Sequence, residues 1–199
     1  MRITVCALWL LAVGAGFAVV LNYQNAGGRA GEAPTRWPKA ALVVLDQDRF
    51  TLVMFIHPQC PCTRASIGEL NHLLAQCSGR VATQVWFFKP GRFLSDWTRT
   101  DLWRSAAAIP GVTVREDVDG AQARLFGAET SGHVLLYDKQ GQLLFHGGIT
   151  GGRGHAGGNA GESAILALTA GGQATVAQTP VYGCSLLGDC ANSPGTNQP

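Results

Sequence analysis

The chain begins with an uninterrupted apolar run. Residues 3–21 carry no charge, and Thr4 is their one polar interruption. A helix of about 20 apolar residues crosses a bilayer, whereas the apolar part of a signal peptide has about 7–15 residues. Arg2 and the amino terminus place positive charge before the run, which predicts an N-inside, C-outside orientation. Residues 1–22 are therefore predicted to be a transmembrane signal anchor, although cleavage after Ala15 or Ala18 stays open as an alternative.

Both alternatives export the rest of the chain. A retained anchor predicts a single-pass protein of the inner membrane with its domain facing the periplasm. A cleaved signal predicts a protein secreted into the periplasm. Residues 23–39 are rich in Gly, Asn, Ala and Pro without periodicity, so they are predicted to form a linker.

Beyond the linker, apolar residues recur at spacings of strands and helices in turn. Residues 40–45 and 49–57 are short apolar runs typical of strands, and the second is continuous, as in a strand buried on both faces. From Thr63 to Cys77 the spacing becomes helical, and Gly79 follows the end.

The later elements follow from the same patterns: a strand at 81–88, a helix between Thr100 and Pro110, a strand at 112–115, a short helix at 121–126, a hairpin of 133–137 and 142–146 around Gly141, and a helix at 161–170. This order predicts an α/β domain over residues 40–172 with a mixed sheet covered on both faces. The cysteine-containing tail, residues 173–199, is polar apart from the stretch 181–187, and it is expected to extend from the domain.

Composition narrows the possible functions. The hydrophobic content of 46% is enough for one ordinary core, and the net charge is only +2. Because no Lys/Arg-rich run with aromatic residues occurs, no nucleic-acid partner is expected. The Gly-rich loop 147–159 follows a hairpin strand instead of opening a strand–helix unit, which argues against a dinucleotide site. No serine or carboxylate constellation indicates a hydrolase.

Two cysteines separated by one residue lie between a predicted strand and a predicted helix. Cys60 and Cys62 are placed where the helix dipole favours a thiolate. A disulfide between them would close a very small ring, whereas the favoured Cα separation is about 5.5–6 Å, so strain would favour the dithiol and give an oxidising couple. We expect Cys60 to attack and Cys62 to resolve. Two purely structural cysteines are the plainer alternative.

These residues resemble a known superfamily. The stretch Phe-Ile-His-Pro-Gln-Cys-Pro-Cys at 55–62 is similar to the active-site strand and turn of the thioredoxin-like superfamily, and 117–128 is similar to the region that returns the chain to that site. More narrowly, 57–62 together with 147–150, 153–155 and 183–184 resembles a bacterial RedB-like group of membrane-tethered thioredoxin-fold proteins. The resemblance implies a three-layer thioredoxin-like fold over 40–172 and a thiol–disulfide oxidoreductase acting on the thiols or disulfides of exported proteins.

The sequence departs from the superfamily pattern at two places. The usual motif is Cys-x-x-Cys, whereas this chain has Cys60-Pro61-Cys62. The strand opposite the cysteines usually begins with a cis-proline, and Gly132 stands at that position here.

The Gly-rich loop supplies further candidates. In a thioredoxin-like sheet it should end beside the cysteines, where Arg153 and His155 would add positive charge near the thiolate or donate a proton to the leaving sulfur. A flexible loop without a role in the chemistry is the alternative.

Two other function classes stay open. Thiolates select Cu(I), so Cys60, Cys62 and His155 could form a copper site like that of thioredoxin-like maturation factors of the SCO type. His57 and His133 are further candidate ligands or else core residues, and His72 and His146 are predicted to be structural or surface residues. The other class is a redox-inactive thioredoxin-fold binding module. No other cofactor is expected.

The remaining cysteines are assigned in the same way. Cys184 and Cys190 are expected to form a local disulfide or, alternatively, a pair that relays electrons to the Cys60–Cys62 pair. Cys77 completes a helix face as a buried thiol, and Cys6 is a small apolar residue of the anchor. The sequence does not indicate the client protein or the direction of electron flow.

Overall fold

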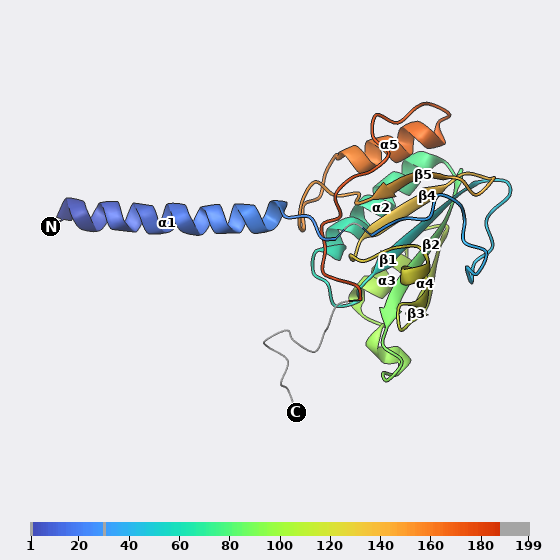
Figure 1. Ribbon diagram of the computed structural model, residues 1–199, viewed down its shortest axis with the longest axis horizontal. Helices are drawn as coiled ribbons and strands as arrows, with labels where there is room; N and C mark the ends of the chain where they lie inside the picture. Colours follow the sequence, from blue (N-terminus) through green and yellow to red (C-terminus); the bar gives the residue numbers. More distant parts are fainter. Residues whose placement is uncertain (1, 30, 188–199) are drawn as a thin grey trace.

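The computed structural model describes residues 2–29 and 31–187 and contains a five-stranded sheet in the order β3-β2-β1-β4-β5. Strands β1, β2 and β3 are parallel, β4 is antiparallel to β1, and β5 is antiparallel to β4 (Figure 1). The elements are α1 (Arg2–Asn25), β1 (Phe50–Ile56), α2 (Thr63–Cys77), β2 (Val81–Lys89), the 3-10 helix η1 (Ser95–Trp97), α3 (Asp101–Ala107), β3 (Val112–Val118), α4 (Ala121–Leu125), β4 (His133–Tyr137), β5 (Leu143–Gly147) and α5 (Ala160–Thr169).

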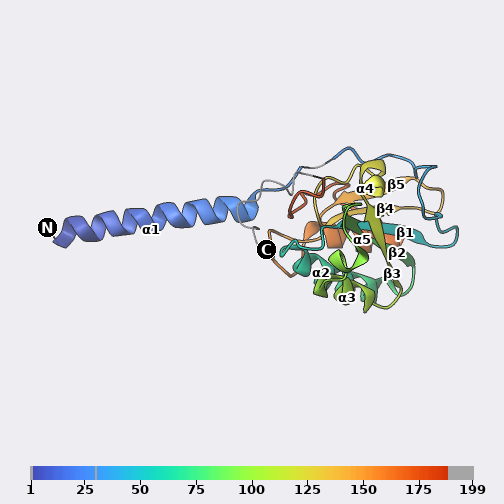
Figure 2. The ribbon, with the colours of Figure 1, turned by 90° about the horizontal axis from the view of Figure 1, so that it is seen from below.

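The sheet separates two hydrophobic clusters because side chains alternate along each strand. On one face, Leu52, Met54 and Ile56 of β1 pack with α2, α3 and α5. On the other face, Val53 and Phe55 pack with α4 and the chain around it. Figure 2 shows α4 on the opposite side of the sheet from α2 and α3. The predicted α/β architecture, a mixed sheet with both faces covered, is confirmed.

One predicted strand is wrong. Residues 40–45 form no strand, although their apolar side chains alternate: Leu42 and Val44 are exposed, while Val43 and Leu45 pack against the second cluster. Strand β1 already has β2 and β4 as its neighbours, so no central position is left for another strand. The segment instead crosses the face of the sheet, and the amide of Leu42 donates to the side chain of Gln122 at 3.0 Å.

The chain on both sides of the predicted domain limits joins the core. Trp37, from the predicted linker, makes edge contacts with Phe126 and Tyr137, with ring centroids 5.1 Å apart in each pair. Val181 and Leu186, from the predicted tail, are each 1% exposed. Residues 174–187 therefore lie against the domain, and the expectation that this part of the tail extends from it is wrong. The apolar residues of the tail have neither the spacing of a strand nor that of a helix. Their packing against the domain could therefore not be predicted from the sequence.

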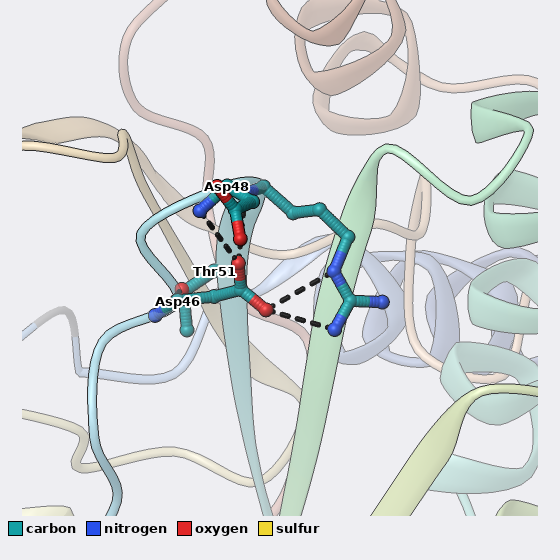
Figure 3. A network of polar contacts seen from close by, with 4 residues as sticks. Asp46, Asp48 and Thr51 are labelled. Atoms are coloured by element: carbon teal, nitrogen blue, oxygen red, sulfur yellow. Dashed lines mark hydrogen bonds and ion pairs between the residues drawn. The ribbon is translucent and has the colours of Figure 1, made fainter.

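A polar turn fixes the entry into β1. The Asp46 carboxylate accepts hydrogen bonds from the backbone amides of Asp48 and Arg49, and the Arg49 guanidinium binds its other oxygen at 2.8 and 3.0 Å (Figure 3). These bonds, first of all the one from the Arg49 side chain, lower the pKa of Asp46. The backbone amide of Asp46 in turn donates to the Thr51 hydroxyl of β1 at 3.1 Å, which ties the turn to the first strand.

Helix α1 projects from the domain as a single rod (Figures 1 and 2). It is 24 residues long and contains no buried residue. It is long and apolar enough to cross a membrane, in agreement with the apolar run of the sequence.

Candidate active site

The two cysteines lie between β1 and α2, as the sequence indicates. Cys60 is in a turn whose backbone bonds run from the Cys60 amide to the His57 carbonyl and from the Thr63 amide to the Cys60 carbonyl, at 3.0 and 3.2 Å. Cys62 is the residue that precedes the first turn of α2. Cys60 is fully buried, whereas Cys62 is half-buried. The Cys60 sulfur is therefore shielded from solvent, whereas the Cys62 residue is partly exposed.

The Cys60 sulfur is surrounded by hydrogen-bond donors. The backbone amide of Cys184 donates to it at 3.3 Å. A hydrogen bond from the Cys184 thiol is the largest cause that lowers the pKa of Cys60, to about 4; burial opposes it, and the Thr63 hydroxyl and amide assist. The shielded sulfur is therefore a thiolate at neutral pH.

The pKa of Cys62 is shifted in the opposite direction. Burial, followed by the negative charge on Cys60, raises the pKa of the Cys62 thiol, and a hydrogen bond with Arg153 opposes this rise. The structure thus pairs a buried thiolate with a more accessible thiol. Attack by Cys60 on a client, as expected from the sequence, requires the chain that covers this sulfur to move aside.

That covering chain is the segment around Cys184. The Ser131 amide donates to the Cys184 carbonyl at 2.8 Å, and the Leu186 amide donates to the Glu129 carbonyl at 2.8 Å. Thr130 and Ser185 form an isolated antiparallel bridge in the same place. The predicted partner Cys190 lies outside the described residues, while the described neighbour of Cys184 is Cys60. We call residues 183–186 the strap.

The loop before β4 contains Gly132, which stands where the superfamily usually has a cis-proline. The φ of Gly132 is +91°, a left-handed conformation that suits glycine and that proline cannot adopt. Every peptide bond among the described residues is trans. The Gly132 amide donates to the Phe55 carbonyl of β1 at 2.7 Å, which fixes the loop against the active-site strand.

Ser131 in this loop joins both sides of the site. Its hydroxyl accepts from the His57 amide at 2.8 Å and lies 2.7 Å from the Thr63 hydroxyl, and both contacts are buried. Neither Ser131 nor Thr63 was a site candidate in the sequence, because a single serine or threonine in a turn carries no distinctive spacing. The one feature of the sequence that points to Ser131 is its position next to Gly132.

Arg153 reaches the site, as predicted. Its guanidinium donates to the Gly183 carbonyl of the strap at 2.7 Å and lies 4.9 Å from the ring centroid of Tyr23 at the end of α1. Its backbone amide donates to the Gln24 carbonyl at 3.1 Å. Arg153 therefore links Cys62, the strap and the last turn of α1.

His155 is placed differently. It is exposed, and its amide donates to the Gly152 carbonyl at 3.3 Å. Within the described residues no hydrogen bond or ring contact joins its imidazole to Cys60 or Cys62. Its predicted role as a proton donor stays a prediction.

The other candidate histidines are buried. His57 stacks on Phe88 with centroids 5.9 Å apart, and burial lowers its pKa while the charge on Cys60 raises it. The ring centroids of His133 and His146 are 5.8 Å apart. Burial, followed by the proximity of His146, lowers the pKa of His133 to about 4. Burial also lowers the pKa of His146, a partly buried residue of β5.

The copper alternative stays a prediction. In the part of the chain that the structure describes, no group of three or more His, Cys, Asp or Glu side chains is arranged to hold a metal ion.

Comparisons with known proteins give only distant likenesses. No protein-family model matches the chain, and no curated protein matches it. A hypothetical protein from Sinorhizobium meliloti has a similar structure, with a TM-score of 0.60 at 20% identity over 78% of this chain and 95% of that one. An uncharacterized conserved protein from Geobacillus kaustophilus has a TM-score of 0.59 at 20% identity over 81% and 92% of the two chains.

A thioredoxin-like protein in its oxidised form gives a TM-score of 0.49 at 18% identity over 75% of this chain and 97% of that one. A secreted disulfide oxidoreductase of Mycobacterium tuberculosis is more distant, at 0.38 and 16% identity. The narrower RedB-like resemblance stays a prediction. The strand order and the helices on both faces of the sheet, with the two cysteines after β1, give the chain a thioredoxin-like α/β fold.

Proposed function

We propose that this protein is an extracytoplasmic thiol–disulfide oxidoreductase that exchanges disulfides with exported proteins at Cys60 and Cys62. The observation that carries the proposal is the buried Cys60 sulfur in the turn before α2, which accepts a hydrogen bond from the Cys184 amide at 3.3 Å and whose pKa is lowered to about 4. A structural cysteine in an apolar core has the opposite property, because burial raises the pKa of its thiol. Cys77 is such a residue: it is 1% exposed, and burial raises its pKa.

The ionised state defines what Cys60 can do. A thiolate of low pKa is a good leaving group when a client thiol attacks a disulfide that contains it. It also stabilises the reduced protein, and a couple whose reduced form is stabilised is oxidising. We therefore propose that the protein donates disulfides to client thiols, with Cys60 as the leaving sulfur.

The location supports the same chemistry. Helix α1 can cross a membrane, and Arg2 precedes its apolar run. By the positive-inside rule the domain would lie outside the cytoplasm. Disulfides persist in that compartment.

The test is disulfide exchange by the full-length protein in detergent, with a reduced dithiol peptide as client. We expect Cys60→Ser to lower the rate at least about tenfold, and Cys62→Ser to lower it less. Cys77→Ala is the matched control, because it removes a buried thiol that lies on the other end of α2, and it should keep the exchange rate.

Retention of the wild-type rate by both Cys60→Ser and Cys62→Ser would contradict the proposal and leave the redox-inactive binding module. Copper content of the reduced wild-type protein, measured on the same sample, tests the copper alternative separately. A ratio of about one copper per chain that is lost in Cys60→Ser would favour that alternative.

A further inference from the structure

The sulfur of Cys60 has a partner that is 124 residues away in the chain. Cys184 is close enough for its backbone amide to donate to Cys60 Sγ at 3.3 Å, and its thiol is also hydrogen-bonded to that sulfur. Cys184 is half-buried, whereas Cys60 is fully buried. Hydrogen bonding to the Cys60 thiolate is also the first cause that raises the pKa of Cys184. The pair is thus one thiolate and one thiol in contact.

The strap is built into the site and does not merely lie near it. Its backbone is held by the amide of Ser131 on the Cys184 carbonyl, at 2.8 Å, and by the guanidinium of Arg153 on the Gly183 carbonyl, at 2.7 Å. Leu186 anchors its far end in the second hydrophobic cluster. Gly183 is required for this fit, because a Cβ there would lie 2.0 Å from the Ser131 carbonyl oxygen.

The alternative pairing within the Cys-Pro-Cys motif is poor by comparison. A disulfide between residues i and i+2 closes a ring too small for relaxed disulfide geometry. Cys184 belongs to a separate segment 124 residues away, so a disulfide with Cys60 is not confined to that small ring. A Cys60–Cys184 disulfide therefore avoids the ring strain of a Cys60–Cys62 disulfide.

We propose that Cys60 and Cys184 form the redox-active disulfide of this protein, and that Cys184 is the sulfur that clients attack. This inference rests on the proposed function and names the disulfide through which it acts. Cys62 then serves as a flanking thiol, and the Cys-Pro-Cys motif positions Cys60 at the start of α2.

The exchange balances as two successive displacements. A client thiolate attacks Cys184 Sγ, a client–Cys184 disulfide forms, the Cys60–Cys184 bond breaks, and its electron pair stays on Cys60 as the stabilised thiolate. A second client thiolate then attacks the client sulfur of that mixed disulfide and expels Cys184, which takes up a proton. The client is oxidised by two electrons and the protein is reduced to the described dithiol state. A disulfide donor, such as oxidised glutathione in vitro, regenerates the Cys60–Cys184 bond.

The experiment maps disulfides in the full-length protein after oxidation by oxidised glutathione, using non-reducing digestion and mass spectrometry. We expect a Cys60–Cys184 peptide pair in the wild type and equally in Cys62→Ser. We expect Cys184→Ser to lower client exchange at least tenfold. A Cys60–Cys62 or Cys184–Cys190 disulfide as the main product, with exchange kept in Cys184→Ser, would overturn the inference while leaving the proposed function intact. A Cys60–Cys184 disulfide without client exchange would instead overturn the proposed function.

A second variant tests the strap without changing any sulfur. Gly183→Ala should displace the strap, lower the yield of the Cys60–Cys184 disulfide at least tenfold, and speed the alkylation of Cys60. Gly158→Ala is the matched control, since no heavy atom lies within 4 Å of a Cβ at that position. An unchanged disulfide yield in Gly183→Ala, with wild-type thermal stability, would count against the inference.

Discussion

At the scale of the residue, the charge on Cys60 comes mainly from direct hydrogen bonds. The sequence indicates the dipole of α2 as the cause, and such an effect is typically about 0.3–1 kcal/mol. A hydrogen bond to a charged group contributes about 1.5–3 kcal/mol. The Cys184 thiol and the Thr63 hydroxyl are the two side chains that donate such bonds. The low pKa therefore depends on tertiary contacts more than on the helix start.

Thr63→Val should raise the pKa of Cys60 because it removes one donor and keeps the side-chain shape. One charged hydrogen bond corresponds to roughly a tenfold or larger change in the acid dissociation constant. The ultraviolet thiolate absorbance of the reduced protein between pH 3 and pH 9 measures it. Thr83→Val is the matched control, since its buried hydroxyl has no hydrogen-bond partner among the described residues. An identical titration in Thr63→Val and Thr83→Val would contradict the assigned role of Thr63.

The same titration has a consequence for stability. The pKa of Cys60 is about 4 in the folded protein against an ordinary value of 9.0, so between these values the unfolded chain binds more protons. The free energy of unfolding of the reduced protein should therefore rise with pH across this window, by at most about 1.4 kcal/mol per pH unit, and this contribution is lost as the pH falls towards 4. Cys60→Ser should flatten the profile, as measured by urea unfolding under reducing conditions.

Part of the site could be predicted from residues alone. Cys60, Cys62 and Arg153 were expected together and the structure brings them together. Cys184 was expected beside Cys190, because spacing along the chain favours near neighbours and does not show which segment folds back over the site. Ser131 and Thr63 act through backbone and hydroxyl contacts that leave no pattern in a sequence.

At the scale of the element, periodicity located the strands and helices that form the core. β1, α2 and β4 were predicted within a few residues of their bounds, since a buried strand and an amphipathic helix each have a distinct apolar spacing. Residues 40–45 have the alternation of a strand but lie across the face of the sheet. Local spacing reports which side chains are buried and does not report whether the backbone pairs with another strand.

The chain before β1 approaches the domain closely at Gly127. Gly127 has a φ of +66°, and a Cβ there would lie 2.0 Å from the Glu32 carbonyl oxygen. Gly79 has a similar φ of +75° with no heavy atom within 4 Å of its Cβ position. Gly79→Ala should cost about 1–2 kcal/mol for the left-handed conformation alone. Gly127→Ala should cost at least about 1 kcal/mol more, because the clash is added.

Urea unfolding of the two glycine variants measures this difference. Equal losses of unfolding free energy would show that the segment before β1 contributes nothing at this contact. Increased proteolytic cleavage between residues 31 and 45 in Gly127→Ala would support the docking independently.

At the scale of the whole molecule, the orientation of α1 decides which proteins the site can meet. In cells we expect protease added outside the cytoplasmic membrane to digest the domain and to spare a tag placed before Met1. The mass of the purified protein separates a retained anchor from cleavage after Ala15 or Ala18. Protection of the domain until the membrane is lysed would contradict the proposed location.

The contacts of Arg153 with Tyr23 and Gln24 join the cysteine site to the end of α1. If α1 is embedded in the bilayer, these contacts keep the thiols next to the outer end of α1. The domain is then not separated from the membrane by a long flexible linker. We therefore expect its redox partners to be proteins that are themselves anchored in the same bilayer or that present an unfolded, cysteine-bearing stretch at the headgroups.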